Sequence, residues 1–257
     1  MYHVPPHVVN TNVGRIAAYV NHVPSGGLPI IFLHGVYFDH HLWDYQIASL
    51  RDRTTIAIDM PLHGSSRSNV KNTWTLHDCA NMLIEVLDAL DIPQVIAVGH
   101  SWGSMTILRA AHKHPERFSA AVLCNMPLFK ASRKQVVKLR LGYPLMVFRD
   151  FYSTQAGKAL FGKSSLRDNP TLIRKLKRTM DLLSNEQIQQ VDRAVIVEAE
   201  DASRMVANLR IKAVAMKGEE DYVPTLPGNV ETVIVPGGHV SPLEQPARVL
   251  ELLLKLL

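Results

Sequence analysis

The chain is predicted to fold as an α/β protein, with a doubly wound, mostly parallel sheet and a helical cap inserted after the sixth strand. Three observations predict this fold class. Short apolar runs alternate with segments of helical periodicity through the first half of the chain. The alternation lapses in residues 127–205 and then resumes, as expected for an insertion. The 257 residues are enough for one large domain with a sizeable core.

The individual elements follow from local patterns. The strands that can be placed are 14–21, 29–33, 54–59, 94–98, 118–123, 211–216 and 230–235. The first alternates as an edge strand does, and the second is a continuous apolar run, typical of a strand covered on both faces. The helices expected outside the cap are 42–50, 76–90, 101–114 and 242–257. Thr75 and Asp78 have the spacing of a capping box before the second of these helices.

Composition and charge divide the chain into a core and a cap. We expect residues 1–126 and 206–257 to form the α/β core and residues 127–205 to form the cap. The net charge is +5, and the stretch from Lys130 to Arg193 alone holds 14 basic and 5 acidic residues. Such a basic surface is most often a solvated face; a second hypothesis is that it meets an acidic surface.

Targeting signals are not evident in the sequence. No apolar run approaches the roughly 18 to 20 residues that span a bilayer. The start of the chain, Met1 to Pro6, lacks a basic stretch followed by an apolar one, so no signal peptide is expected. Cys79 and Cys124 lie far apart without metal-ligand spacing and are interpreted as small core residues in a reducing compartment. A cytoplasmic location is therefore expected.

The sharpest local signal is the stretch from Val95 to Met105. An apolar run stops at Gly99, one hydroxyl follows at Ser101, and a helix begins at once. A serine at so tight a turn strains its own backbone, and the residues two positions away, Gly99 and Gly103, must be nearly free of side chain. The stretch resembles the nucleophile elbow of the α/β-hydrolases. The alternative is a chance glycine turn whose serine caps the helix.

A serine becomes a nucleophile only with a base to take its proton and a third group to orient that base. In α/β-hydrolases the acid and then the histidine follow the serine in the chain. His239 comes after the last expected strand and Asp221 just past the strand before it, so both face the crevice at the carboxyl ends of the strands. The resemblance therefore implies a triad of Ser101, Asp221 and His239. Glu219 and Glu220 stay open as alternative acids.

The resemblance covers roughly residues 29–257 and also implies an oxyanion hole made by the backbone N–H groups of Val36 and Trp102. This agrees with the physics, because the Trp102 amide begins a helix and Val36 follows a glycine that lets the backbone approach a substrate. Two departures stand out. Leu62 replaces a glycine of the family loop, which we expect to alter only the loop geometry. About eight residues separate Asp221 from the strand at Val230, too few for the usual crossover helix, so an irregular link is expected there.

The implied function is that of a cofactor-free serine hydrolase that cleaves a carboxylic ester or lactone through an acyl-enzyme. The subgroup it resembles most is the capped esterase, lactonase and C–C-bond hydrolase branch. Diketone (C–C-bond) hydrolysis and perhydrolase activity use the same triad and stay open. Epoxide hydrolases and haloalkane dehalogenases are disfavoured, because both use aspartate where Ser101 stands. A non-catalytic ligand receptor on the same fold is the alternative from another class.

Substrate contacts and partners complete the expectations. The side chains expected to contact substrate are Tyr37, Phe129, Phe148 and Tyr152. No metal or cofactor is expected, since the histidines lack metal-ligand spacing and no glycine-rich phosphate loop is present. The expected partner is a small ester or lactone, with an anionic substrate as a second hypothesis. No nucleic acid is expected because no recognised motif accompanies the basic residues. The chain is expected to be a monomer or homodimer.

Overall fold

A computed structural model describes residues 5–24 and 27–257; the expectation for the start of the chain falls partly on Met1 to Val4, outside these residues. Within the described residues, eight strands form one sheet in the order β1-β2-β4-β3-β5-β6-β7-β8. The strands are β1 (His7–Thr11), β2 (Gly14–Asn21), β3 (Ile30–Leu33), β4 (Thr55–Ile58), β5 (Val95–His100), β6 (Phe118–Cys124), β7 (Lys212–Gly218) and β8 (Glu231–Val235). β1 pairs antiparallel with β2, and β2 with β4, while the remaining pairs are parallel. The mostly parallel α/β fold is confirmed.

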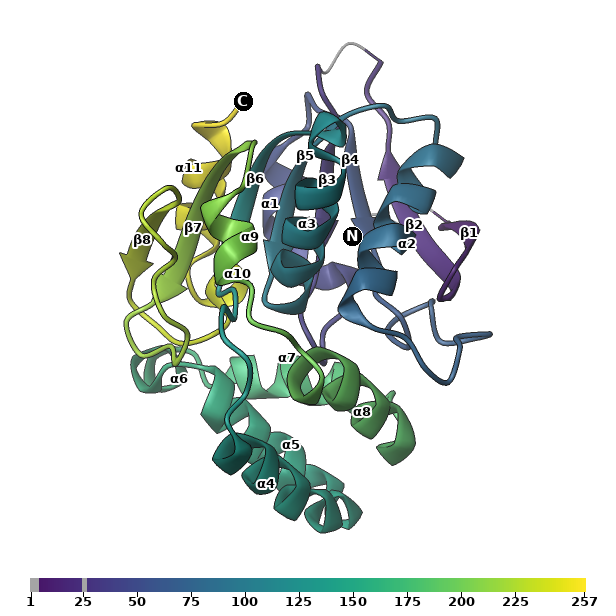
Figure 1. Cartoon of the computed structure of the whole chain (residues 1–257). Helices are drawn as coiled ribbons and strands as arrows, with labels where there is room; N and C mark the ends of the chain where they lie inside the picture. The colour runs from purple at the N-terminus through teal and green to yellow at the C-terminus, as the bar shows by residue number, and fades with distance from the viewer. Residues whose placement is uncertain (1–4, 25–26) are drawn as a thin grey trace.

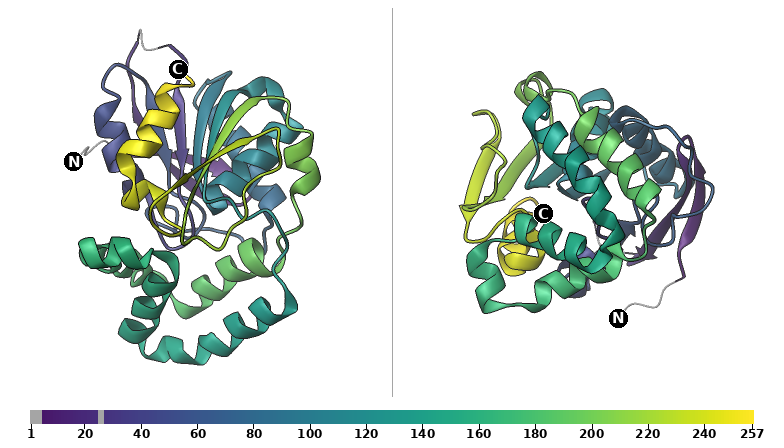
Figure 2. Two further views of the ribbon diagram at one scale, coloured as in Figure 1. Left: turned by 90° about the vertical axis from the view of Figure 1, so that its left-hand side faces the viewer. Right: turned by 90° about the horizontal axis from the view of Figure 1, so that it is seen from below.

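Helices cover both faces of the sheet (Figures 1 and 2). One face carries α2 (Leu76–Ala89), α3 (Trp102–Lys113) and α9 (Ser203–Ala207). The other face carries α1 (Asp44–Ser49) and α11 (Pro246–Leu254), with α10 (Ser241–Glu244) leading into α11. Shorter helical turns are η1 (His40–Trp43), η2 (Pro115–Arg117), η3 (Tyr143–Val147) and η4 (Arg193–Val197). The core lies between the sheet and these two helical layers.

A group of helices between β6 and β7 lies beyond one end of the sheet (Figure 1). They are α4 (Arg133–Gly142), α5 (Arg149–Leu160), α6 (Lys163–Asp168), α7 (Thr171–Met180) and α8 (Asn185–Asp192). Hydrogen bonds tie this group to loops that follow parallel strands. The His239 N–H, beyond β8, donates to the Leu160 carbonyl at 2.6 Å, and the Thr179 hydroxyl donates to the carbonyl of Tyr37, beyond β3. The group therefore covers the carboxyl ends of the strands.

Local sequence explains several of these elements. β3 and β5 are buried at every residue, as their unbroken apolar runs indicate. α2 begins with the expected capping box: the Thr75 hydroxyl accepts from the Asp78 N–H at 3.2 Å, and the Thr75 N–H donates to the Asp78 carboxylate at 2.9 Å. Cys79 and Cys124 are both buried and free, which confirms their interpretation as core residues.

The structure differs from the sequence-based expectation in three places. β1 was not expected; because it pairs with β2, the edge of the sheet is β1 and not β2. The expected helix 242–257 is two helices, because Pro246 lacks the N–H that would continue α10 and begins α11 instead. α9 begins at Ser203 and packs on α3, so the expected boundary between residues 205 and 206 falls inside a helix of the core.

The short link between β7 and β8 agrees with the expectation from residue count. No helix occupies residues 219–230, all of which the structure describes, although the two strands pair in parallel. The link is an irregular loop in which the Val230 N–H donates to the Pro227 carbonyl at 3.0 Å. The loop with Asp221, called the acid loop, follows β7, and the loop with His239, called the histidine loop, follows β8. The two loops consequently leave neighbouring strands at the same edge of the sheet.

Candidate active site

Ser101 occupies the turn between β5 and α3 with φ 48° and ψ −108°. This region is sparsely populated for residues with a side chain, and holding one there costs about 1–3 kcal/mol. The Ser101 N–H donates to the Cys124 carbonyl at 2.8 Å, which fixes the turn against the end of β6. A Cβ on Gly99 would lie 2.5 Å from the backbone of α3, and one on Gly103 would lie 2.1 Å from the backbone of β3. The glycine spacing is thus a steric requirement of this turn.

The structure brings the three expected triad side chains together from three loops. His239 Nε2 lies 2.9 Å from Ser101 Oγ, and His239 Nδ1 lies 2.8 Å from Asp221 Oδ1. With Nδ1–H donating to the carboxylate, Nε2 is left to accept the serine proton. Ser101 and His239 are 5% and 3% exposed, so water is largely kept from both groups. The geometry is that of a hydroxyl with its base and the group that orients the base.

Asp221 is held in its charged form. Burial raises the pKa of Asp221, but hydrogen bonds and charge from His239, together with hydrogen bonds from Asn125 and the Val223 N–H, outweigh burial and hold that pKa below its usual value. The two closest contacts are Asn125 Nδ2 at 2.7 Å and His239 Nδ1 at 2.8 Å. A carboxylate that stays ionised fixes the orientation of the imidazole.

Asn125 is a site residue that the sequence reasoning missed. Its side chain donates to Asp221 and, at 3.2 Å, to the Gly238 carbonyl, and its own carbonyl oxygen accepts from the Ser241 N–H at 3.1 Å. It is fully buried and adopts a left-handed φ of 51° directly after β6. Asn125 therefore joins the acid loop to the histidine loop. Its place at the carboxyl end of a predicted strand was the signal that could have indicated it.

Glu220, one of the two alternative acids, has another partner. Its carboxylate accepts from the Lys163 N–H at 2.9 Å and from the Ser164 hydroxyl at 2.8 Å, so it caps the start of α6. Glu219 is exposed, and its N–H pairs with the Val235 carbonyl at 2.8 Å. Among the three acidic residues of this loop, Asp221 is therefore the one in contact with His239.

A second carboxylate organises the backbone on either side of His239. Glu244, at the end of α10, accepts from the N–H groups of Gly238 at 2.8 Å and Val240 at 2.9 Å. It also accepts from the Gly162 N–H at 2.9 Å, between α5 and α6. Packing leaves no room at this junction, since a Cβ on Gly238 would lie 2.4 Å from the Gly162 nitrogen. Sequence reasoning missed Glu244, whose partners are fixed only by the tertiary fold.

Two aromatic side chains flank the imidazole. His100 Nε2–H donates to the His239 carbonyl at 2.6 Å, and burial lowers the pKa of His100 to about 3, so it is a neutral hydrogen-bond donor. Tyr222 stacks on the His239 ring with centroids 4.7 Å apart and planes 22° apart. Its hydroxyl lies 3.4 Å from His239 Nε2, the atom that also contacts Ser101. Tyr222 consequently shields the imidazole from solvent on one side.

The loop that carries Val36 is fixed by two buried histidines. His34 Nε2 accepts from the Met60 N–H at 2.9 Å, and His63 Nε2 accepts from the Tyr37 N–H at 3.0 Å. Burial lowers the pKa of His34 to about 3 and of His63 to about 4, so both are neutral, as acceptor nitrogens must be. Both histidines therefore act as structural hydrogen-bond acceptors for this loop.

The two amides expected to form an oxyanion hole remain available as donors. Trp102 is the first residue of α3, so its N–H has no carbonyl partner within the helix. Among the hydrogen bonds of the described residues, none is donated by the Val36 N–H. A Cβ on Gly35 would lie 2.4 Å from His100 Nδ1, so only glycine lets this loop approach the end of β5. Both expected donors therefore lie in segments that border Ser101.

Leu62 adopts φ 70° in the loop after β4. This is the left-handed region that glycine occupies without strain, so leucine here keeps the conformation of a glycine and stores backbone strain. Its side chain is buried in the core, which offsets that strain. The leucine that replaces the family glycine is therefore accommodated within this loop.

The four residues expected to contact substrate separate into two pairs. Tyr37 is buried beside Val36, and Tyr152 lies near the same buried carboxylate as Tyr37. Phe129 and Phe148 are 57% and 66% exposed, so the structure does not bury them with the triad. The exposure of these two rings argues against a direct role in a closed site.

The carboxylate beside Tyr37 belongs to Asp192 of α8, which sequence reasoning missed. Asp192 is fully buried, and its Oδ1 accepts from the Tyr37 hydroxyl at 2.5 Å. Burial raises the pKa of Asp192 to about 7, because hydrogen bonding by Tyr37 and Tyr143 does not replace the lost hydration. Asp192 lies within a helix of ordinary amphipathic pattern, so no local signal distinguished it from a solvated acid.

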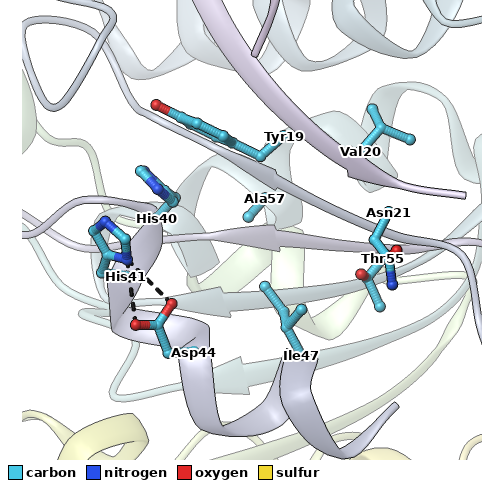
Figure 3. Close-up of a pocket in the computed structure, with 9 residues that line it drawn as sticks. All are labelled: Tyr19, Val20, Asn21, His40, His41, Asp44, Ile47, Thr55 and Ala57. Carbon is cyan, nitrogen blue, oxygen red and sulfur yellow. Dashed lines mark hydrogen bonds and ion pairs between the residues drawn. The ribbon is translucent and has the colours of Figure 1, made fainter. Parts of the chain in front are cut away.

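A small pocket lies away from Ser101, His239 and Asp221, where β2 and β4 meet η1 and α1 (Figure 3). Tyr19 stacks on His40 with ring centroids 3.7 Å apart, and His41 pairs with Asp44 at 3.2 Å. His40 Nδ1 lies 2.9 Å from the buried carboxylate of Asp59.

Across the described part of the chain, no group of three or more His, Cys, Asp or Glu side chains is arranged to hold a metal ion. None of the helices in the described residues is long and apolar enough to cross a membrane.

Comparison with known proteins agrees with this architecture. An esterase from Thermogutta terrifontis superposes with a TM-score of 0.82 at 20% identity, covering 98% of this chain and 97% of the other. An enol-lactonase from Burkholderia xenovorans LB400 superposes with a TM-score of 0.83 at 16% identity, covering 97% and 99%. An epoxide hydrolase 2 of Siraitia grosvenorii is 30% identical over 139 residues, which are 52% of this chain and 43% of the relative.

The curated relatives are matched over only part of their length: the chain spans about half of each of the first three, or 44%, 47% and 43%. The family comparison covers more of this chain. The model that describes the alpha/beta hydrolase fold matches residues 29–188, which include the strand β3, the elbow and the helices α4 to α7. Because this match extends over more than half of the chain, the protein belongs to the alpha/beta hydrolase family.

Proposed function

We propose that this protein is a serine hydrolase that cleaves carboxylic esters or lactones through an acyl-enzyme, without a cofactor. One observation carries the proposal: the continuous contact from Ser101 through His239 to Asp221, with distances of 2.9 and 2.8 Å. Serine reacts with a carbonyl only when a base is within hydrogen-bond reach, and this base is oriented by a buried carboxylate.

In the proposed reaction, His239 Nε2 takes the proton of Ser101 as Oγ attacks the carbonyl carbon. The imidazolium is stabilised by Asp221 and then protonates the leaving alcohol oxygen. Water next gives its proton to His239 and attacks the acyl carbon, and Ser101 leaves as the restored hydroxyl. The Trp102 and Val36 amides hold the tetrahedral oxyanion in both halves; loss of one such donor typically costs about 10²- to 10³-fold in rate.

The substrate class rests on two kinds of support. The superposed esterase and enol-lactonase share the fold over nearly the full chain, which makes acyl transfer to water the first reaction to test. Asp192, buried beside Tyr37, would repel an anionic acyl group whenever it is ionised, so we propose an uncharged acyl group. The basic residues of α4 are exposed, and we give them no role in holding an anionic substrate.

Epoxide hydrolysis, the activity named for one relative, does not suit this nucleophile. A carboxylate that opens an epoxide leaves an ester, which water can cleave. Ser101 in the same attack would leave an ether, which no group in this site can hydrolyse. Diketone cleavage and perhydrolysis pass through the same acyl-enzyme, and they remain the alternative reactions for a substrate panel to separate.

Substitution of Ser101 tests the proposal directly. We expect Ser101→Ala to fold normally and to lose several orders of magnitude of activity on a panel of short esters and lactones. A fluorophosphonate probe should label the unmodified protein at Ser101 and leave the variant unlabelled. Ester hydrolysis that survives in Ser101→Ala would refute the mechanism. Absence of labelling and of turnover in the unmodified protein would favour a non-catalytic receptor on the same fold.

A further inference from the structure

The helix α4, the first helix after β6, has no buried residue. Val137 and Leu141 are one helical turn apart and are 55% and 73% exposed. An apolar pair so exposed on a helix gains nothing from the fold of the chain itself. Figure 1 shows α4 at the far side of its helical group from the sheet, where it is open to the surroundings.

The charge around this apolar pair has one sign. Residues 127–149 include no acidic residue; the first one after this stretch is Asp150. The basic residues of α4 are all exposed: Arg133, Lys134, Lys138 and Arg140. Among the described residues, none of these four forms an ion pair, whereas Lys177 of α7 pairs with Asp150. The cations are therefore free to meet an outside partner.

The arrangement around the helix is specific. At about 100° per residue, Val137 and Leu141 fall in the middle of the exposed arc of α4. Basic side chains flank this apolar pair on both sides, with Arg133 and Arg140 on one side and Lys134 and Lys138 on the other. These six residues are called the α4 face. Exposed apolar side chains continue beyond it in η3, in α5 and at the residue between them. They are Leu145, Val147, Phe148 and Phe151. α5 contacts η3, and η3 contacts α4.

We propose that the α4 face docks this protein onto an anionic lipid surface. An apolar stripe flanked by long cationic side chains suits such a surface, because the apolar groups enter the acyl boundary while the ammonium and guanidinium groups remain at the phosphates. A nucleic acid would pair with the cations but would give Val137 and Leu141 no apolar layer. Docking by this face is peripheral, requires no spanning helix, and does not depend on the proposed reaction.

Vesicle binding tests the docking surface. The full chain is sedimented with vesicles of phosphatidylcholine alone and with vesicles of equal parts phosphatidylcholine and phosphatidylglycerol. We expect binding to the mixed vesicles only, weakening as salt is raised. Lys134→Gln with Lys138→Gln should weaken binding by about fivefold for each charge removed. Val137→Ser with Leu141→Ser should also weaken binding, while both pairs leave hydrolysis of a water-soluble ester unchanged.

Matched substitutions elsewhere on the surface serve as controls. Arg210→Gln with Lys255→Gln removes the same charge from exposed positions outside α4, and Val8→Ser with Leu254→Ser removes apolar groups that are 49% and 53% exposed. Neither pair should change vesicle binding. Equal loss in the controls, equal binding to both vesicles, or no binding would overturn the proposal. So would a dimer in light scattering that Val137→Ser with Leu141→Ser dissociates in a protein that ignores vesicles, since the face would then pair two copies of the chain.

Discussion

At the scale of single residues, the proposed nucleophile is held in a conformation that its side chain resists. Ser101 has a φ of 48°, and Ser101→Gly would relieve a strain of about 1–3 kcal/mol while adding about 0.5–1 kcal/mol of backbone entropy loss. Ser101→Ala removes the hydroxyl and keeps the strain. We therefore expect the glycine variant to unfold at higher urea concentration than the alanine variant, with both inactive. Equal midpoints would mean that the strain is no larger than the entropy cost of the glycine, about 0.5–1 kcal/mol.

Asn125 provides a second test at this scale. Asn125→Ala removes the 2.7 Å hydrogen bond to Asp221, and hydrogen bonds to a charged group contribute about 1.5–3 kcal/mol. Because this bond favours the ionised carboxylate, its loss should raise the pKa of Asp221 and make the carboxylate a stronger base. Asp221 would then stabilise the protonated, inactive form of the proposed base His239 more strongly, which moves the acid limb of the pH–rate profile upward. Asn81→Ala, which removes an exposed contact to Lys113, is the matched control and should leave the profile unchanged. An unshifted acid limb in Asn125→Ala would contradict this role.

These residues also show what a sequence can and cannot predict. Ser101 was predictable because its signal is local: the glycines that fit the turn lie two positions away. The place of His239 and Asp221 after strands predicted that both lie at the same edge of the sheet, whereas the choice of Asp221 over Glu219 and Glu220 came from the resemblance to α/β-hydrolases. Asn125 and Asp192 were not, since their partners lie 96 and 155 positions away and only the assembled fold selects them.

At the scale of elements, the histidine loop and the helical group share one junction. Glu244 accepts three backbone N–H groups there, two of them beside His239. In Glu244→Gln one acceptor oxygen becomes an amide nitrogen, which leaves a donor facing a donor. We expect kcat to fall about tenfold with KM little changed, because the base is displaced while the substrate surface is not. Glu251→Gln, an exposed acid paired with Arg248, is the control and should have no effect. An altered KM at constant kcat would contradict a positioning role.

Helices and strands could be predicted where their sequence signal is strong and local. Buried strands such as β3 and β5 were predicted because covered strands have unbroken apolar runs. The helix-free link between β7 and β8 was predicted from residue count alone. β1 was missed because its exposed, short edge carries little apolar periodicity. The break at Pro246 had a visible signal, the proline, which the leucine pattern of the terminal helix obscured.

At the scale of the whole molecule, three buried histidines in and around the candidate site are neutral. Burial lowers the pKa of His34 to about 3, of His63 to about 4 and of His100 to about 3, against 6.5 in an unfolded chain. Between pH 6.5 and about 4 the unfolded chain therefore binds three protons that the native protein does not. Asp192 acts in the opposite direction, because its native pKa of about 7 exceeds the ordinary 3.8. For these four groups together, the unfolded chain binds a net two protons more than the native protein.

Stability should accordingly fall as the pH drops below 6.5. Each proton contributes about 1.4 kcal/mol per pH unit, so two correspond to a slope of about 3 kcal/mol per pH unit at most. Urea midpoints measured between pH 6.5 and 4.5 check this slope. Asp192→Asn removes the group that opposes the three histidines, so its stability should fall more steeply with acid than that of the unmodified protein. An equal slope in Asp192→Asn would mean that Asp192 is ionised in both the native protein and the unfolded chain at these pH values, and that burial has not raised its pKa.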